Sequence, residues 1–338
     1  MAVAQAIVVD VHGHLLDVAY RADAKLEARL GGNTDFPSMR QGGVTAQLCA
    51  MWTPDITLSG PHDHSVKEPL AVLLGVFDYL ERELRSSAGA SVLLATKATD
   101  LKLAAGTRRI ALIVGMEGTD ALGSDPAVLG RLYARGLRHV GLVHEHANEF
   151  GASSQVWENG RMRHYRPGQD QERHLTAAGR VLLDEMKRLG ILIDLVHLVE
   201  PGFSEVLDYI RTPVLVSHGG ARGVADSIRY LSDDQIRAVA RWDGVIGASP
   251  TPLGPSTEEP GLPLLLDTID YLVRLVGCRH VGVGTDFKDT HHYYPDNFST
   301  SADTPRLVQG LRDRGYSVCD IELISGGNFM RLFGDVVG

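Results

Sequence analysis

The sequence has few cysteines and no excess of basic residues, and both shortages narrow the possible classes of protein. Its three cysteines form no Cys-x-x-Cys pair, and their odd number argues against a disulfide framework. There are 33 Lys and Arg against 42 Asp and Glu, which leaves a formal net charge of -9. Because binding to phosphates requires a basic surface, we expect no nucleic-acid partner.

The sequence also lacks a long hydrophobic run. No apolar stretch approaches the ~20 residues that a membrane-spanning helix requires, so we expect no membrane partner. The first residues, MAVAQAIVVDVHGH, lack the basic segment of a secretory signal and lead directly into a strand pattern. Together with the low cysteine content, these features predict a cytoplasmic protein.

What the sequence does contain is an alternation of short apolar runs and longer amphipathic segments. Hydrophobic residues make up 44% of the 338 residues, enough for a large buried core. Most short runs are continuous in Val, Ile and Leu, as is typical of parallel strands buried on both faces. Eight strands are predicted, at residues 7–14, 44–52, 109–118, 137–146, 191–198, 213–219, 244–250 and 280–287.

Helical patterns separate these strands, and several have recognisable beginnings. Asp125 and Pro126 are typical of an N-cap and a first helical position. Thr176 is a second N-cap candidate, and Ser232 with Gln235 fits a capping box. Helices are predicted at residues 66–85, 177–189, 264–276 and 321–332, among others.

A strand followed by a helix, repeated eight times, predicts a (β/α)8 or TIM barrel. No linker interrupts the chain, so we expect one domain over residues 1–338. Two polar stretches break the alternation, at residues 151–174 and 288–304. Both follow strands, and we expect both to be loops over the mouth of the barrel.

Histidine and acidic residues stand at the carboxyl ends of the predicted strands. In parallel barrels these ends surround one centre, where the chemistry of such folds takes place. The sequence therefore predicts a single shared site. Its candidate residues are His12, His14, Glu117, His144, His146, His197, His218 and Asp286.

The spacing of His12 and His14 places both side chains on the same side of a strand. Two neutral imidazoles on one face can form half of a metal site. Two histidines satisfied by ordinary hydrogen bonds are the alternative interpretation. Matching residues at other strand ends favour the metal site.

Glu117 follows an apolar run, where an unpaired carboxylate is costly to bury. Its two oxygens could bridge two ions at the ~3.5–4 Å spacing of two-metal sites. The alternative is an exposed loop residue. His197 and His218 end apolar strands and can complete the second half of a binuclear site, while Asp286 could transfer a proton or cap a helix.

Several ordered blocks of the sequence resemble the membrane (renal) dipeptidase family, peptidase family M19, of the amidohydrolase-like barrels. The resemblance runs almost from end to end of the chain, which makes it specific. The blocks include MEGTDALGSD at 116–125, GLRHVGLVHEHANEFGASS at 136–154, LTAAGRVLLDEMKRLGILIDLVHL at 175–198, PVLVSHGGAR at 213–222 and HVGVGTDF at 280–287.

This resemblance implies two zinc ions bridged by Glu117. One ion would also be bound by the first-strand pair His12 and His14, and the other by His197 and His218. The family has His-x-Asp on the first strand, whereas this chain has a second imidazole at position 14. Because this carboxylate is missing, two alternatives stay open: the site could hold a single ion, or it could hold iron or manganese in place of zinc.

By the same resemblance, His144 polarises the scissile carbonyl, Arg229 binds the substrate carboxylate and Asp286 transfers a proton. The implied activity is hydrolysis of an amide bond in a dipeptide or a similar small molecule by a metal-activated hydroxide, and a homodimer is also implied. The change at His14 leaves an alternative open: an amidohydrolase-type or non-hydrolytic metalloenzyme acting on a different small molecule.

Other histidines support weaker predictions. His146 lies two residues beyond His144, and we expect it to be a supporting or loop residue. The histidines of residues 61–64 lie in a polar segment, where we expect surface exposure. Those at 291–292 are predicted to belong to a mouth loop that contacts substrate.

Overall fold

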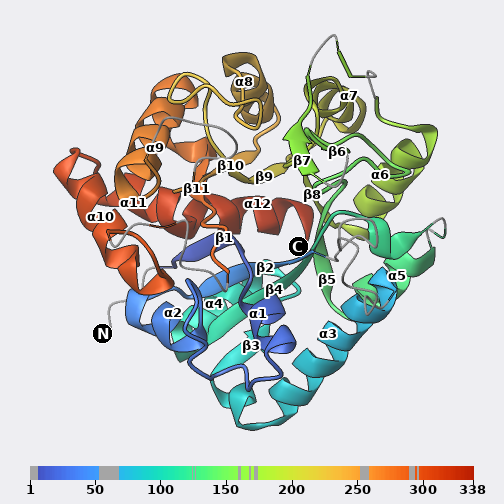
Figure 1. Cartoon of the computed structure of the whole chain (residues 1–338). Helices are drawn as coiled ribbons and strands as arrows, with labels where there is room; N and C mark the ends of the chain where they lie inside the picture. The colour runs from blue at the N-terminus through green and yellow to red at the C-terminus, as the bar shows by residue number, and fades with distance from the viewer. Residues whose placement is uncertain are drawn as a thin grey trace.

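Eight parallel strands form a nearly closed barrel with helices around it (Figure 1). The computed structural model describes residues 7–52, 68–123, 125, 127–158, 161–166, 169–170, 174–251, 259–288, 294 and 297–338. The strands follow one another in the order β1, β2, β4, β5, β8, β9, β10, β11. A parallel bridge between Gly13 and Phe287 brings the end of the series back beside its beginning. The predicted (β/α)8 fold is confirmed.

All eight predicted strands are present, and each is shorter than predicted. The sequence ranges ran too far because several strands are followed by apolar or histidine-bearing loop residues that continue the pattern of the strand. The barrel strands are β1 (Val9–Gly13), β2 (Ala46–Trp52), β4 (Ile110–Glu117), β5 (Leu137–Gly141), β8 (Leu192–Asp194), β9 (Leu215–Gly219), β10 (Val245–Ala248) and β11 (Val281–Val283). An additional strand, β3 (Val92–Leu94), pairs with β4 alone.

Two helices begin where the predicted capping residues stand. The Thr176 side chain accepts a hydrogen bond from Gly179 N, and Ser232 forms a capping box with Gln235. The helices are α1 (Leu15–Arg21), α2 (Phe36–Gly42), α3 (Pro69–Arg85), α4 (Ala98–Thr107), α5 (Ala127–Ala134), α6 (Ala177–Leu189), α7 (Glu200–Ile210), α8 (Asp233–Arg241), α9 (Leu262–Val276), α10 (Thr304–Asp313), α11 (Val318–Glu322) and α12 (Asn328–Val336). In the described part of the chain, no helix is both long and apolar enough to cross a membrane.

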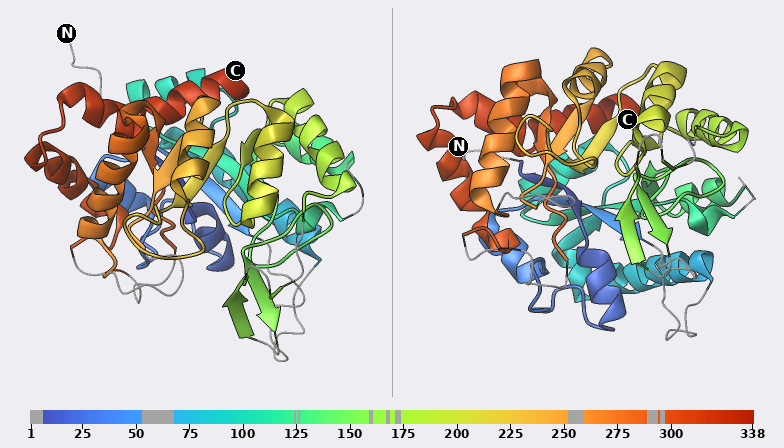
Figure 2. Two further views of the ribbon diagram at one scale, coloured as in Figure 1. Left: turned by 90° about the horizontal axis from the view of Figure 1, so that it is seen from above. Right: turned by 45° about the horizontal axis from the view of Figure 1, so that its top comes forward.

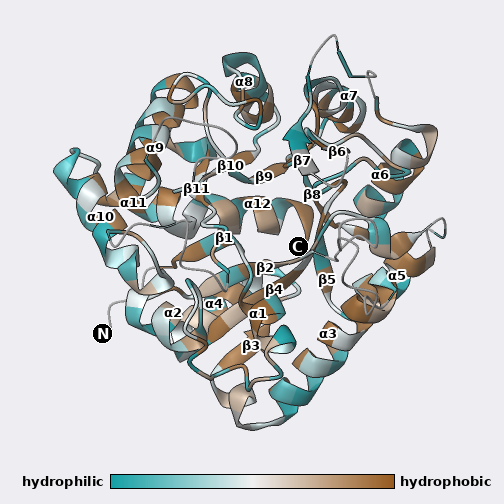
Figure 3. Ribbon diagram, in the orientation of Figure 1, coloured by the Kyte–Doolittle hydropathy of each residue, from teal (hydrophilic) through white to brown (hydrophobic). Residues whose placement is uncertain are grey.

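The core has two layers because successive strand residues face opposite sides. Residues such as Val11 and Ile113 fill the barrel, and α12 contributes Phe329 and Phe333 to this inner cluster. Alternate residues such as Leu112 pack outward in the larger cluster between strands and helices. The helices accordingly carry brown apolar stripes and teal outer faces (Figure 3). This packing leaves the carboxyl ends of the strands free for polar side chains.

The polar stretch 151–174 is not entirely a loop. It contains an antiparallel hairpin of β6 (Gln155–Glu158) and β7 (Arg161–His164), which projects from the barrel as a green pair of strands (Figure 2). The base of this hairpin is fixed to the segment after β8, since Ser153 bridges Leu198 and Ser154 N donates to His197 O at 2.7 Å. The residues on either side show no apolar alternation, but the sequence Asn159-Gly160 between them is typical of a two-residue hairpin turn, and this signal was overlooked.

The prediction of one continuous helix at residues 321–332 is also wrong, because the helix is interrupted. The chain forms α11, then a wider turn over Leu323–Gly327, then α12. Gly326 departs from helical geometry, with φ 175° and ψ -20°. A Cβ there would lie 2.5 Å from Ile7 O, so the close approach of the first strand segment explains both the glycine and the interruption.

Candidate metal centre

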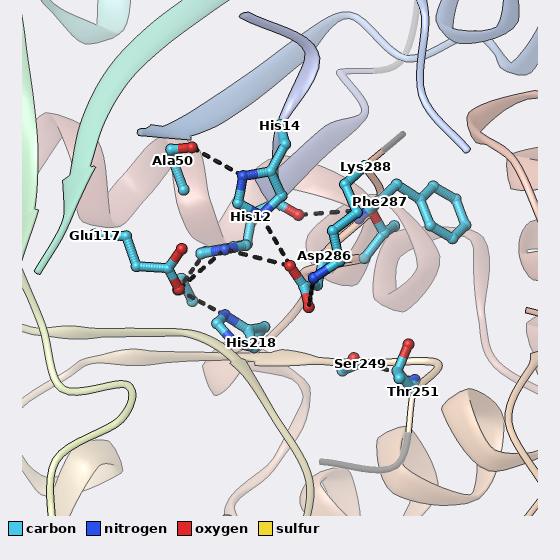
Figure 4. Close-up of polar contacts among 12 residues, drawn as sticks. His12, His14, Ala50, Glu117, His218, Ser249, Thr251, Asp286, Phe287 and Lys288 are labelled. Atoms are coloured by element: carbon cyan, nitrogen blue, oxygen red, sulfur yellow. Dashed lines mark hydrogen bonds and ion pairs between the residues drawn. The ribbon is translucent and has the colours of Figure 1, made fainter. Parts of the chain in front are cut away.

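The predicted residues lie together at the carboxyl ends of the strands. Figure 4 shows His12, His14, Glu117, His218 and Asp286 pointing toward one another from separate elements. Hydrogen bonds of the backbone hold the first and last of these elements together. Asp286 N donates to His12 O at 2.9 Å, and His14 N donates to Phe287 O at 3.0 Å.

Glu117 is the last residue of β4 and is 3% exposed. Its Oε1 lies 3.0 Å from His197 Nε2 and 3.4 Å from His12 Nε2, and its Oε2 lies 3.9 Å from His144 Nε2. Burial acts to raise the pKa of this carboxyl, but the imidazoles of His12 and His144 hold it well below its usual range. Glu117 is therefore a buried anion surrounded by nitrogen ligands.

His12 has one ring nitrogen fixed and the other available. Its Nδ1 lies 2.8 Å from Ser217 Oγ, whereas its buried Nε2 has no hydrogen-bond partner among the described residues. Nε2 faces the carboxylates of Glu117 at 3.4 Å and Asp286 at 3.8 Å. Buried polar atoms normally have partners, so an orphaned nitrogen directed at two carboxylates fits a metal ligand.

His14 also has one ring nitrogen fixed by a hydrogen bond and the other directed at a carboxylate. Its Nδ1 lies 2.9 Å from Ala50 O, and because a carbonyl oxygen can only accept, Nδ1 carries the hydrogen. In the neutral ring Nε2 is then an acceptor, yet it lies 2.9 Å from Asp286 Oδ1. A hydrogen on Nε2 or a metal ion bound by both atoms would satisfy this contact, so the pair fits a metal site.

His197 and His218 are held in the form that binds metals. Burial and the nearby Arg229 lower the pKa of His197 to about 3, and burial with the neighbouring His12 puts the pKa of His218 well below its usual range. Both rings are therefore neutral near pH 7. His197 also has a left-handed backbone, with φ 67°, a conformation that is uncommon outside glycine and concentrated at functional sites.

The possible ligand atoms form three overlapping groups, and within each group all of them lie within 4.8 Å of one another. The groups are His12, His14 and Asp286; His12, Glu117 and His218; and Glu117, His144 and His197. Glu117 belongs to two groups, as expected of a carboxylate whose two oxygens can be shared by neighbouring ions, whereas His12, also in two groups, has one nitrogen available and can bind only one ion. The division differs from the one drawn from the sequence in two ways: His14 lies with Asp286 rather than with Glu117, and His218 lies with His12 rather than with His197. These nitrogen and oxygen donors fit a divalent ion such as zinc.

A buried polar network supports the first strand beneath the site. Asp10 accepts hydrogen bonds from Thr285 N at 3.0 Å, Thr285 Oγ1 at 2.8 Å and Gln47 Nε2 at 3.0 Å. This carboxylate thereby joins β1 to β2 and to the segment after β11. Gly13 belongs to the same arrangement, since a Cβ there would lie 2.3 Å from Gln47 Nε2 and 2.8 Å from Asp10 Oδ2.

A pocket of about 160 Å³ opens over the metal-ligand groups. Its lining is His14, Trp52, Glu117, His144, Glu145, His197, His218, Arg229, Asp286 and Lys288. Trp52, Glu145 and Lys288 were not among the site residues predicted from the sequence. None of them belongs to a motif or spacing that would mark it as functional. Lys288 Nζ lies 3.5 Å from Asp286 Oδ2, and this ion pair contributes to a pKa of Asp286 well below its usual range.

The two histidines after β5 have different surroundings. His144 lines the pocket and belongs to a possible ligand group with Glu117 and His197. His146 Nε2 instead lies 2.9 Å from Asp120 Oδ1, and His146 is not among the residues that line the pocket. The structure thus places His144 at the site and His146 beside it. The histidines at 61–64 and 291–292 lie outside the described residues.

Arg229 lies in the loop between β9 and α8 and reaches the same pocket. Its Nη1 donates to Gln155 Oε1 at 2.9 Å, and its Nη2 lies 3.4 Å from His197 Nε2. The guanidinium is therefore held against a candidate metal ligand, at one wall of the pocket. Gln155 was not predicted from the sequence, because a lone glutamine in a polar stretch carries no recognisable signal.

A barrel with histidines and carboxylates gathered at the carboxyl ends of its strands defines a metal-dependent hydrolase of the (β/α)8 class. The chain belongs to the membrane dipeptidase family, peptidase family M19, whose family model matches residues 2–337. It is a metallo-dipeptidase-like hydrolase. The resemblance inferred from the sequence blocks is confirmed.

Relatives and solved structures agree with this assignment. The chain is 28% identical over 323 residues to the dipeptidase aclJ of Aspergillus oryzae, an alignment that covers 94% of this chain and 73% of the relative. The crystal structure of dipeptidase AC, a metallopeptidase of family M19, is 26% identical, with a TM-score of 0.85 and 99% of each chain covered. A Rhodobacter sphaeroides metallopeptidase, crystallised with a phosphinate mimic of the dipeptide L-Ala-D-Ala, shares the fold with 24% identity and a TM-score of 0.83, over 98% of this chain and 99% of that one.

Proposed function

We propose that this protein hydrolyses the amide bond of a dipeptide, or of a dipeptide-like small molecule with a free carboxylate. The observation that carries the proposal is the position of Glu117, whose buried carboxylate belongs to two groups of possible metal ligands. His12, His14, His197 and His218 would supply the nitrogen ligands of the zinc site, and Glu117, which groups with His12 and His218 on one side and with His144 and His197 on the other, would be shared between two ions. A divalent ion bound there makes water a nucleophile at neutral pH and polarises an amide carbonyl.

The remaining side chains would bind and orient the substrate. Arg229 presents a planar, permanently charged group, which suits a carboxylate. His144 borders both the pocket and Glu117, where its Nε2 could donate a hydrogen bond to the carbonyl oxygen as charge develops on it. Asp286 would take up a proton and return it to the leaving amine, a transfer that requires its carboxylate to face the pocket, as it does.

A panel of dipeptides tests the proposed function. Zinc-loaded protein is expected to hydrolyse L,L or L,D dipeptides, to lose the activity when a chelator removes the metal, and to regain it when zinc is restored. The same dipeptides with a C-terminal amide are expected to be poorer substrates, because they lack the group that Arg229 would bind. Full metal occupancy without turnover of any dipeptide would refute the proposal.

A second candidate is hydrolysis of a different small amide or lactam. The observation that favours it is Lys288, which adds a second cation to the pocket beside Asp286 and so suits a substrate with more negative charge than a simple dipeptide. The same screen separates the two candidates if it includes dipeptides with an acidic side chain and cyclic amides.

Metal binding is expected to release about one proton from His12 near pH 7, in addition to any that metal-bound water releases. Burial acts to lower the pKa of His12, but the carboxylates of Glu117 and Asp286 outweigh it and raise the pKa to about 9. The metal-free ring is therefore protonated at pH 7 and must lose its proton before Nε2 can bind an ion. Protons therefore compete with the metal ion for His12. Below about pH 9, the apparent metal affinity should fall roughly tenfold for each unit by which the pH is lowered.

Calorimetric titration of chelated protein with zinc, in buffers of different ionisation enthalpy, measures that release. The contribution of His12 should approach one proton at about pH 7 and decline toward zero above about pH 9.5, while the release from metal-bound water persists. The neutral rings of His197 and His218 and the ionised Glu117 should add nothing at neutral pH. Absence of proton release at pH 7 would show that His12 is neutral or is not a ligand.

A further inference from the structure

Gln155 lies between the candidate metal ligand His197 and the candidate carboxylate-binding residue Arg229. It is the first residue of β6 and 4% exposed. Its Oε1 lies 2.8 Å from Nδ1 of His197 and accepts a hydrogen bond from Nη1 of Arg229 at 2.9 Å. A single buried oxygen therefore contacts both the candidate metal ligand and the candidate carboxylate-binding group.

The arginine determines the orientation of the amide. A guanidinium can only donate hydrogen bonds, so the Gln155 atom facing Arg229 is the carbonyl oxygen rather than the NH2 group. The same oxygen then accepts from His197, and Nδ1 of that ring must carry its hydrogen. With its hydrogen on Nδ1, the ring can bind a metal ion only through Nε2, and it is Nε2 that faces Glu117 Oε1 at 3.0 Å.

The backbone holds Gln155 in this position. Ser154 N donates to His197 O at 2.7 Å, and Val199 N donates to Ala152 O at 3.0 Å, so the base of the hairpin runs alongside the segment that carries His197. Gln155 N donates to Ser153 Oγ at 3.0 Å, which fixes the next turn of the chain. The side chain thus reaches His197 from a neighbouring and well-anchored segment.

From this geometry we infer that Gln155 is a positioning residue that serves metal binding and substrate binding at once. It keeps the hydrogen of His197 on Nδ1, so that Nε2 is the ring atom that can bind a metal ion, and it holds the guanidinium of Arg229, whose Nη2 lies 3.4 Å from that Nε2, at the wall of the pocket. Hydrogen-bond partners of this kind orient metal-binding histidines, and their loss typically weakens metal affinity about 10–100-fold. The role of Arg229 in this inference rests on the proposed function.

Two substitutions separate this role from simple packing. Gln155→Met keeps the size of the side chain and removes the acceptor, whereas Gln155→Glu keeps an acceptor for both partners. Gln309→Met is the control, because Gln309 is an exposed residue of α10 that bonds only Asp313 among the described residues. Thermal unfolding of each variant verifies that it is folded.

Zinc affinity, measured by competition with a chelator, should fall about 10–100-fold in Gln155→Met and should recover in Gln155→Glu. At saturating zinc, Gln155→Met should also raise KM for a dipeptide about tenfold, with little change for the C-terminal amide, since the misplaced group is Arg229. Gln309→Met should match the unmodified protein in both measurements.

Unchanged zinc affinity and unchanged KM in a folded Gln155→Met protein would overturn the inference. So would a Gln155→Glu protein as impaired as Gln155→Met, because a purely structural role would not distinguish the two. The zinc measurement needs no turnover. A protein that binds zinc through Gln155-dependent contacts but cleaves no dipeptide would therefore refute the proposed function and leave the positioning of His197 supported.

Discussion

Glu117→Gln is expected to lower kcat/KM for dipeptides by about 10³-fold or more, because loss of the ion removes several kcal/mol of transition-state stabilisation. The substitution keeps the shape of the side chain and removes its negative charge. Glu117 is the buried anion that faces Nε2 of both His12 and His197, so its neutral analogue cannot balance two cations at this buried position. Zinc content per chain, measured by elemental analysis, should fall together with activity.

Glu185→Gln is the matched control for this variant. Glu185 lies on α6 and forms a surface ion pair with Arg188, so its loss should leave metal content and turnover unchanged. A folded Glu117→Gln protein with full zinc occupancy and an undiminished rate would contradict the role assigned to the carboxylate. Full zinc with a reduced rate would instead limit Glu117 to a catalytic contribution and remove it from the ligands.

Arg229→Met is expected to lower kcat/KM about 10²-fold for dipeptides with a free carboxylate, the effect of losing a charge-assisted contact worth roughly 2–3 kcal/mol. Methionine retains part of the apolar stem but cannot pair with an anion. Arg229→Lys should give an intermediate loss, because an ammonium keeps the charge without the planar pair of donors. Kinetics on a dipeptide and on its C-terminal amide, run side by side, measure the difference.

The amide substrate is the internal control, and it should be affected far less than the free acid. Arg237→Met controls for the chemistry of the substitution, since Arg237 lies on α8 and pairs with Asp233 and Asp234 at the surface. Equal losses for the acid and the amide would show that Arg229 acts on the site as a whole and does not recognise the carboxylate.

The barrel could be predicted because parallel strands covered by helices need continuous apolar runs, and those runs are visible in the sequence. The polar residue that ends such a run is equally visible, which is why Glu117 and His218 could be selected without coordinates. Their convergence follows from the closed order of the strands, since a barrel directs all carboxyl ends to one side.

The contacts within the site could not be predicted in the same way. The pairing of His14 with Asp286 joins the first and last strands, and it depends on the ring geometry set by Ala50 O. Gln155 and Lys288 lie in polar segments that lack hydrophobic periodicity. Such a sequence does not show which polar side chain points into a site and which points into solvent. Their importance comes from what they touch, and that is fixed only when the hairpin and the loop after β11 are in place.

The position of the ions is the most direct test of the central claim that residues from separate strands form one metal centre. Crystals of the zinc-loaded protein, measured by anomalous diffraction at the zinc edge, would locate each ion independently of any assay. We expect peaks about 2.0–2.2 Å from ring nitrogens of His12, His197 and His218 and from Glu117 oxygens. Zinc-loaded, dipeptide-hydrolysing crystals without a peak among these side chains would contradict the claim.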